Sequence, residues 1–231
     1  MTASPRSADA SAAASEAAVP ATARRRLPAE ERRRAVLDAA RDVFARRGYH
    51  GAGIAEIAST CGCSEPILYR HFASKQALFA AVLVDAAALL RARIAPIFEE
   101  AEDPLDALVA VAATASEDEL FIQISRLRML AATLVSEPEI QEALAQTVTE
   151  MHGRLTGLMA RAREHGSLRA DIDPAEAAWL WFGVALQVGY RGAVFGTERL
   201  GEARRTAAAL IDLLTADRPP ATARPTQENR P

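Results

Sequence analysis

The feature that most constrains the fold is a pair of short helical segments within residues 53–72, which read GIAEIASTCGCSEPILYRHF. Gly62 breaks the first predicted helix, whose apolar face consists of Ile54, Ile57 and Ala58. The second predicted helix, over Glu65–Phe72, carries Pro66 in its first turn, where a missing N–H does no harm. Two short helices on either side of such a turn are the layout of a helix-turn-helix.

The rest of the chain shows the 3.6-residue period of amphipathic helices, and few stretches are β-branched or aromatic enough for strands. Further helices are expected over residues 28–48, 75–94, 105–115, 119–135, 139–165, 173–195 and 201–215. We therefore predict an all-α protein with an N-terminal three-helix head and a larger C-terminal helical domain. The predicted divisions are a disordered tail over 1–23, the head over 24–74, the larger domain over 75–216 and a second disordered tail over 217–231.

Charge is distributed unevenly along the chain. The formal net charge is only -3, but residues 24–75 carry more Arg and Lys than Asp and Glu, and residues 76–231 carry fewer. A basic head on an acidic body is expected when one part of a protein faces phosphates. Chance clustering of arginines is the alternative interpretation of the charge alone.

Several protein classes find no support in the sequence. Cys61 and Cys63 are the only cysteines and do not make a disulfide framework. No signal peptide and no apolar run long enough for a membrane helix occurs, so we expect a cytoplasmic protein with no membrane partner. No phosphate-binding loop, metal-spaced cluster or nucleophile motif is present, so we expect no cofactor, no metal and no enzymatic activity. A helical enzyme that binds a small molecule is the alternative.

Many positions of the head agree in order and spacing with the signature of one family. They are Gly48-Tyr49, Ile57-Ala58, Cys61-Gly62-Cys63-Ser64, Leu68-Tyr69-Arg70-His71-Phe72, Ser74-Lys75 and Leu78-Phe79. Over about residues 30–83 the chain resembles the TetR family of transcriptional regulators. The body resembles this family only in the number and layout of its helices.

The resemblance implies a set of DNA-binding residues: Gly53, Ser64, Glu65, Pro66, Tyr69, Arg70, His71 and Lys75. In this set Ser64 caps the recognition helix. Tyr69, His71 and Lys75 match phosphate-binding positions, for which a phenol, an imidazole N–H and an ammonium group are suitable donors. Lys75 is the only lysine of the chain and lies at a helix N-terminus, where the dipole disfavours a cation. A nearby phosphate explains this placement, and a solvated lysine is the alternative.

The chain departs from the family pattern in places. The family often has Thr or Ser before the first short helix, where this chain has Ala52 and Gly53 and so lacks a hydroxyl. Glu65 is unusual for a phosphate-facing position. It either accepts a hydrogen bond from N4 of a cytosine or is an exposed residue of a type favoured at the start of a helix. The runs Arg24–Arg26 and Arg32–Arg34 either contact the DNA backbone or minor groove or are solvated.

Cys61 and Cys63 occupy positions where the family has small apolar residues. Buried cysteines behave as small hydrophobic residues, which is the simpler interpretation. A redox or metal sensor is the alternative, but a metal needs more ligands, and only His50 and His71 lie nearby in the sequence.

The predicted helix over 173–195 is apolar around most of its circumference. Such a helix is buried on both sides, and we expect it to pack with the last helix against the same helices of a second chain, in a two-fold four-helix bundle. TetR-like proteins dimerise in this way. The interface candidates are Trp179, Tyr190, Val194, Leu210 and Leu214. A helix buried inside a monomer is the alternative.

The resemblance also implies a ligand pocket between this bundle and the helices of residues 105–165. The candidates combine apolar character with occasional polar groups, as in most small-molecule sites: Phe98, Phe121, Ile124, Arg128, Met129, Met151, His152 and Phe182. Arg128 either faces an acidic ligand or forms an ordinary ion pair. The apolar members are otherwise plain core residues.

These expectations combine into a sequence-specific transcriptional regulator, expected to be a repressor. A homodimer would bind a palindromic operator in double-stranded DNA, with recognition helices ~34–36 Å apart. A small-molecule effector would release it, because the effector prefers the state that cannot bind DNA. An activator or a recruiter of another protein is one alternative. A sequence-neutral nucleic-acid binder is another, although it would require a basic rather than an acidic body.

Overall fold

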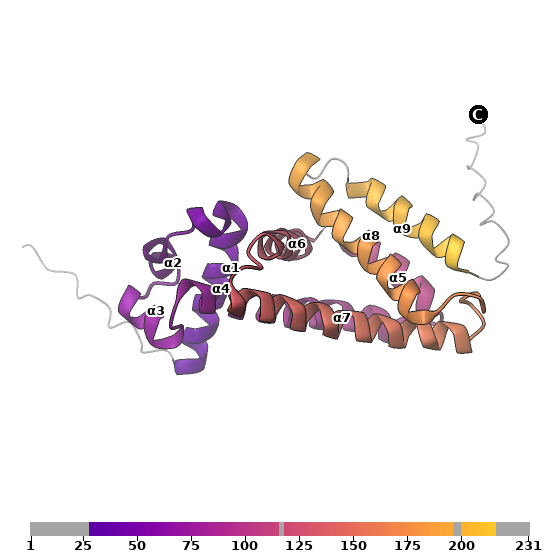
Figure 1. Ribbon diagram of the computed structural model, residues 1–231, viewed down its shortest axis with the longest axis horizontal. Helices are drawn as coiled ribbons and strands as arrows, with labels where there is room; N and C mark the ends of the chain where they lie inside the picture. Colours follow the sequence, from indigo (N-terminus) through magenta and orange to yellow (C-terminus); the bar gives the residue numbers. More distant parts are fainter. Residues whose placement is uncertain (1–27, 116–117, 196–199, 216–231) are drawn as a thin grey trace, which may run out of the picture.

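The computed structural model describes residues 28–115, 118–195 and 200–215. These residues form nine α-helices, with a small head at one end of an elongated body (Figure 1). The helices are α1 Ala29–Gly51, α2 Ile54–Thr60, α3 Glu65–His71, α4 Lys75–Glu100, α5 Pro104–Ala115, α6 Glu119–Ala132, α7 Pro138–Glu164, α8 Pro174–Phe195 and α9 Leu200–Leu214. The predicted all-α class is confirmed. Within the described ranges, no helix is both long and apolar enough to span a membrane.

The head is built on the apolar face of α1. Phe44 is fully buried there and meets the edge of Phe79, with ring centroids 4.9 Å apart. Ile57 of α2 and Leu68 of α3 are buried in the same core. Because Phe79 belongs to α4, the core of the head continues into the first half of that helix, and α4 is fixed to the head by packing.

Two long helices, α4 and α7, pack along each other through the body (Figure 1). α6 packs on α1 and α4 through Ile124, Leu127 and Ala131, and it also contacts α8. A second core lies where α5, α7, α8 and α9 meet, around Leu108, Met159, Trp181 and Ile211. One helix, α4, therefore runs from the core of the head into the body.

The largest difference from the predicted helix ends concerns α4. We expected this helix to end near Ile94 because Pro96 follows, but it continues to Glu100. A proline inside a helix leaves the carbonyl four residues earlier without its N–H donor. That carbonyl belongs to Ala92, which is exposed, so water can satisfy it and the helix continues. The stop predicted at Gly48 does occur as a break within α1, where φ is 71°.

Candidate nucleic-acid interface

α2, the turn at Gly62 and α3 form the helix-turn-helix of the head (Figure 1). Gly62 has a φ of 67°, which glycine adopts without strain. The N–H of Cys63 donates to the carbonyl of Ala58 at 2.9 Å, and Leu68 is buried beneath α3. The turn and this anchor hold α3 against the head with its opposite side facing outward.

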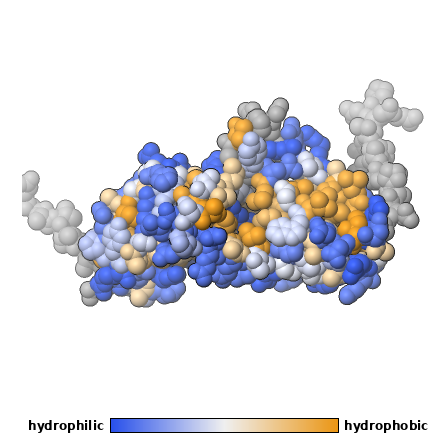
Figure 2. All heavy atoms as spheres, in the orientation of Figure 1, coloured by the Kyte–Doolittle hydropathy of each residue, from blue (hydrophilic) through white to orange (hydrophobic). Residues whose placement is uncertain are grey.

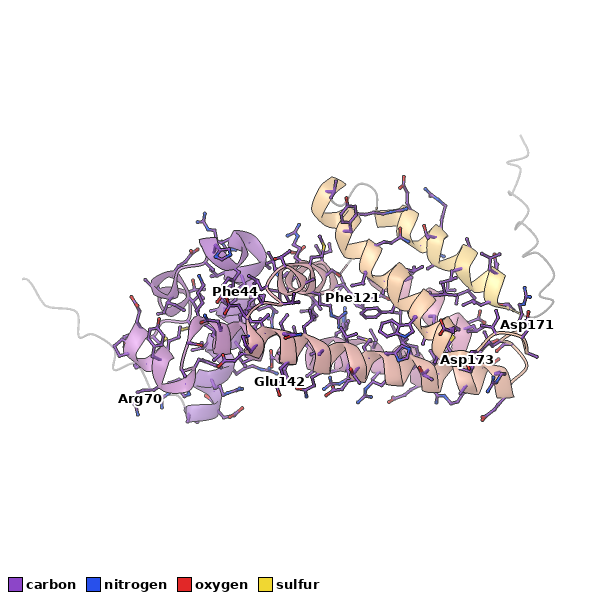
Figure 3. The ribbon with its side chains drawn as sticks, in the orientation of Figure 1. Phe44, Arg70, Phe121, Glu142, Asp171 and Asp173 are labelled. Atoms are coloured by element: carbon purple, nitrogen blue, oxygen red, sulfur yellow. The ribbon has the colours of Figure 1, made fainter. Side chains whose placement is uncertain are left out.

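The outward side of α3 and the residues flanking it are open to solvent. The exposed residues among the predicted DNA-binding set are Gly53, Ser64, Glu65, Pro66, Tyr69 and Arg70. Tyr69 keeps 46% of its surface exposed, a large value for an aromatic side chain. Arg70 lies at the outer end of the head (Figure 3), and His71 is half-buried. The arrangement leaves donors of α3 available to a ligand that approaches the head from outside.

Ser64 occupies the N-cap position of α3, but its hydroxyl makes no capping hydrogen bond. A capping oxygen accepts from the N–H of the second or third helical residue. Here the second residue is Pro66, which has no N–H, and the N–H of Ile67 donates to the backbone carbonyl of Ser64 at 2.9 Å. The cap expected from the resemblance is therefore absent from the described structure, and the hydroxyl stays exposed.

Lys75 begins α4 directly beside the head. Its ammonium group lies 4.9 Å from the centroid of the Tyr49 ring, a cation–π contact. Burial lowers the pKa of Lys75, and no carboxylate of the described residues lies within ion-pair distance of it. The neighbouring Ser74 caps α4 by accepting the N–H of Ala77 at 2.9 Å. The described part of the protein thus holds this cation in place but does not neutralise it.

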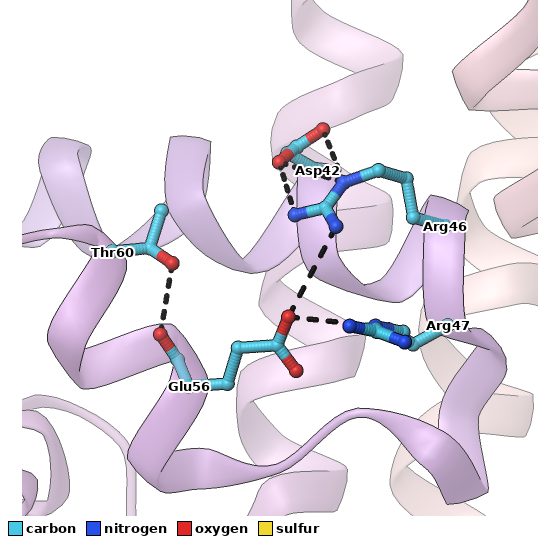
Figure 4. A network of polar contacts seen from close by, with 5 residues as sticks. All are labelled: Asp42, Arg46, Arg47, Glu56 and Thr60. Atoms are coloured by element: carbon cyan, nitrogen blue, oxygen red, sulfur yellow. Dashed lines mark hydrogen bonds and ion pairs between the residues drawn. The ribbon is translucent and has the colours of Figure 1, made fainter.

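A polar network joins α2 to α1 (Figure 4). Glu56 of α2 lies 3.5 Å from Nε of Arg47 and 4.0 Å from Arg46. Arg46 in turn donates to Asp42 at 2.7 Å, and this hydrogen bond lowers the pKa of the Asp42 carboxyl. These ion pairs neutralise part of the positive charge of α1, and those made by Glu56 hold α2 in position against α1.

Two arginines of the run in α1 contact other parts of the protein. Arg34 forms an ion pair with Asp85 of α4, and the guanidinium group of Arg33 lies 5.3 Å from the centroid of the Phe72 ring. Nε of Arg32 is buried without a partner among the described residues. Arg24–Arg26, the other run predicted to contact DNA or solvent, lies outside the described residues.

The cysteine pair lies in the turn of the helix-turn-helix. Cys61 and Cys63 are free thiols and half-buried, with their sulfur atoms 2.9 Å apart. No group of three or more His, Cys, Asp and Glu side chains in the described ranges has an arrangement that could hold a metal ion.

A cavity of about 550 Å³ lies between the second half of α4 and α7. Of the predicted ligand-binding residues, Phe98 and Met151 line it. The sequence did not point to the other lining residues, which include Arg91, Ile94, Ala95, Leu155 and Leu158. Helical periodicity shows which residues share a face, but it does not show that these faces of α4 and α7 leave a space between them.

The remaining ligand candidates occupy three kinds of position. Ile124 is buried in the core of the head, and Phe182 in the core of the body. Phe121, labelled in Figure 3, and Met129 are half-buried on α6. The ring of His152 stacks on Trp179 at 4.2 Å between centroids, and its Nε2 lies 3.1 Å from the carbonyl oxygen of Ala175.

Arg128 has the least usual environment of these candidates. Its Nη2 atom has no contact with solvent and no hydrogen-bond partner among the described residues. Burial lowers the pKa of Arg128 to about 10. The ordinary ion pair considered as an alternative is thus absent from the described part of the chain.

The apolar circumference of α8 is buried on one side only. Trp181 and Phe182 face the core, whereas Trp179, Tyr190 and Val194 are exposed. Figure 2 shows hydrophobic side chains gathered over the region where α8 and α9 lie. On α9, Leu214 is buried and Leu210 half-buried, because they face α5 and α8. Leu186 and Leu213, which were not among the interface candidates, are also exposed, at 38% and 70%.

Comparison with known proteins agrees with this geometry. Residues 36–82 match the family described as "Bacterial regulatory proteins, tetR family". The chain is 31% identical over 164 residues to the HTH-type transcriptional regulator RutR of Escherichia coli (strain K12), covering 69% of this chain and 74% of RutR. It is 57% identical over 58 residues to the HTH-type transcriptional activator FasR of Mycolicibacterium smegmatis, but this match covers only 25% of this chain and 26% of FasR.

Solved structures share the fold at low identity. A TetR-family regulator from Rhodococcus sp. superposes with a TM-score of 0.72 and 22% identity, covering 81% of this chain and 100% of that chain. A transcriptional regulator from Saccharomonospora viridis, in complex with choline, has a TM-score of 0.71 and 22% identity, covering 82% and 100%.

A helix-turn-helix head on a wholly helical body, with relatives that are transcriptional regulators, defines a DNA-binding transcriptional regulator. The likeness to RutR covers more than two thirds of each chain. The chain belongs to the TetR family, as the resemblance of its head predicted.

Proposed function

We propose that this regulator represses transcription from a palindromic operator, which it binds as a homodimer and leaves when a small molecule binds. It would act in the cytoplasm, where bacterial DNA lies. The observation that carries the DNA-binding role is the exposed side of α3, with Tyr69 and Arg70, beside Lys75, whose charge no described carboxylate neutralises. Side chains on α3 would read base edges, while Lys75 and the half-buried His71 would hold phosphates.

The proposed dimer rests on the outward side of α8. Trp179, Leu186, Tyr190 and Val194 are exposed there, and Leu213 extends the apolar surface onto α9. Contiguous apolar surface of this kind marks a protein interface. Pairing two copies through it would create a two-fold axis, and a two-fold axis requires a palindromic site.

The proposed effector site is the cavity between α4 and α7. Apolar side chains such as Phe98 and Met151 line it together with arginines, including Arg91, which is 3.3 Å from Glu150. The regulator from Saccharomonospora viridis was solved with choline, so the same fold holds a small molecule in that protein. Arg128 is a second candidate contact, since an acidic group on the effector would neutralise its buried charge.

α4 provides a direct route between this cavity and the DNA. Its first half packs in the head through Leu78 and Phe79, and its second half lines the cavity through Ile94 and Phe98. An effector that shifts the second half of α4 would change the position of the head, and so the spacing of the two recognition helices. Operator affinity then falls by linkage.

Activation of transcription is the second candidate function. FasR is named a transcriptional activator, and its likeness to this chain is confined to a segment of 58 residues. A DNA-binding head alone does not set the sign of regulation, because that depends on where the operator lies relative to the promoter. Transcription measured in the presence and absence of the protein separates the two outcomes.

The test of the proposed function is a fluorescence-anisotropy titration against the DNA upstream of the protein's own coding sequence, at fixed salt and with random DNA as competitor. Saturable binding with a two-fold symmetric footprint is expected. Binding that the competitor abolishes would refute sequence-specific recognition of that DNA. Once an effector is found, equal effector affinity with and without operator would refute release by linkage.

A further inference from the structure

The turn of the helix-turn-helix contains two thiols in unusually close contact. The sulfur atoms of Cys61 and Cys63 are 2.9 Å apart, less than 1 Å longer than a disulfide bond of ~2.05 Å. Both residues are half-buried, and Cys63 lines a hollow of about 610 Å³ between α2 and α3. A small oxidant can therefore reach the pair from solvent.

The distance favours a disulfide over a bridging metal. Two thiolates on one tetrahedral zinc, with bonds of ~2.3 Å, would hold their sulfurs about 3.8 Å apart. A metal site would also need further ligands, which the described residues do not place near this turn. Backbone hydrogen bonds at the turn, from Cys61 to Ile57 at 3.0 Å and from Cys63 to Ala58 at 2.9 Å, keep the two sulfurs together.

We infer that Cys61 and Cys63 are a redox modification site, at which a hydroperoxide forms a disulfide within the turn and thereby weakens operator binding. The chemistry of the site stands on the geometry of the turn. Its effect on the operator rests on the proposed function.

The reaction balances with the peroxide as the only oxidant. The thiolate of Cys61 attacks one peroxide oxygen, the O–O bond breaks, and the departing alkoxide takes a proton to leave as an alcohol. The sulfur of Cys63 then attacks the sulfenic sulfur of Cys61. The S–O bond breaks, and hydroxide leaves as water with the proton of Cys63. Burial and the hydrogen bond to Cys61 raise the pKa of Cys63 to about 12, so this thiol stays protonated at neutral pH and leaves the first attack to Cys61.

The disulfide acts on the recognition helix because the turn is short. α3 begins at Glu65, two residues after Cys63, and the hydroxyl of Ser64 adds no capping bond to steady this start. A disulfide must shorten the S···S distance to ~2.05 Å and adopt a dihedral angle near 90°. Both changes act on the backbone between α2 and α3, so the exposed face of α3 is displaced from its DNA-binding position.

The experiment treats the full-length protein with hydrogen peroxide and follows intact mass and operator affinity together. The expected result is loss of two hydrogen atoms in a monomeric, thiol-reversible species, with operator affinity lowered about fivefold or more. In Cys63→Ala, oxidation should stop at a sulfenic acid on Cys61, which dimedone labels. Addition of dithiothreitol to the oxidised wild type should restore operator binding.

The double variant Cys61→Ala/Cys63→Ala is the matched control, because it keeps the four methionines of the chain and reports their oxidation alone. Its operator binding should not respond to peroxide, and its circular dichroism should match the wild type. Absence of the disulfide in the wild type, or a disulfide that leaves operator affinity unchanged, overturns the inference. Reduced protein that binds no operator would refute the proposed function instead, and the mass readout would still decide whether the disulfide forms.

Discussion

At the scale of single residues, Lys75 carries a charge that the described part of the protein leaves uncompensated. The ring of Tyr49 supports its ammonium group at 4.9 Å, while burial lowers its pKa and the dipole of α4 disfavours a cation at this position. A phosphate would offset both the burial and the dipole, because it supplies a negative charge beside the ammonium group. The placement of Lys75 is therefore better explained by the DNA complex than by the stability of the free protein.

Replacing Lys75 by Gln should weaken operator binding and flatten its salt dependence. Each lost phosphate contact reduces the slope of log K against log salt by about 0.9, and a dimer loses one contact in each protomer. Anisotropy titrations at several salt concentrations measure both effects. Arg163→Gln removes the same charge from an exposed site in the last turn of α7 and should leave the slope unchanged. A wild-type slope in Lys75→Gln would contradict the phosphate role.

Arg128 is a second cation with no ion-pair partner among the described residues, and it is half-buried on α6 with its Nη2 atom closed off from solvent. Its pKa of about 10 lies below the ordinary value of an arginine because burial penalises the charged form. The penalty is fully present below about pH 10, and it fades as the pH rises through this pKa toward the ordinary pKa of arginine. At neutral pH the effector-free protein therefore carries the full cost of this buried cation.

Replacing Arg128 by Met should stabilise the effector-free protein, raising its free energy of unfolding by about 1–3 kcal/mol, because a well-packed apolar side chain avoids the desolvation cost. Chemical denaturation at neutral pH measures this change. Arg126→Met on the same helix is the control and should have little effect, since no atom of Arg126 is buried without a partner. A large loss of stability in Arg128→Met would show that the guanidinium group already has a compensating partner.

At the scale of helices, the starts of α3 and α4 offer a matched pair of serines. Ser74 accepts the N–H of Ala77 and caps α4, whereas Ser64 caps nothing. Ser74→Ala should lower the free energy of unfolding by about 1 kcal/mol, and Ser64→Ala by much less. Thermal denaturation of both variants provides the comparison. Equal losses would mean that the stability effect does not come from the capping bond.

Helices were predicted well where short-range rules decide them. Ser74 before α4 and Gly48 within α1 are local signals, and both act in the structure as their chemistry suggests. Pro96 misled the prediction, because its cost depends on whether water reaches the carbonyl of Ala92, which only the packed structure shows. Ser64 misled it for a local reason, since Pro66 removes one of the N–H groups that its hydroxyl needs.

More of the candidate site could be predicted from the sequence in the head than in the body. The exposed side of α3 follows from the order and spacing of the head residues. The cavity between α4 and α7 depends on how two long helices approach each other, and nothing local to Ile94 or Leu158 encodes that. For the same reason, periodicity placed Leu214 on an apolar face but did not show that α5 and α8 cover this face from within the same chain.

At the scale of the whole molecule, the exposed apolar surface on α8 and α9 supports the proposed dimer. Tyr190 and Val194 keep 55% and 52% of their surface exposed, and Leu213 keeps 70%. Burying such surface releases about 25 cal/mol for each Å² removed from water. A second copy can bury it symmetrically, and the same two-fold axis would place two heads on one palindrome.

Replacing Tyr190 by Glu should shift the protein from dimer to monomer, because dimerisation would then bury an unpaired carboxylate on each side of the two-fold axis. Sedimentation velocity measures the change, and operator affinity should fall with it, since each monomer contacts only one half-site. Val135→Glu is the control: Val135 is also an exposed apolar residue, at 48%, but it follows α6 and lies outside the α8 and α9 surface. Dissociation of both variants would show a general effect of added charge. A Tyr190→Glu variant that stays dimeric would show that the interface lies elsewhere. A monomeric wild type would contradict the proposed dimer, because a single head would then have to bind the operator alone.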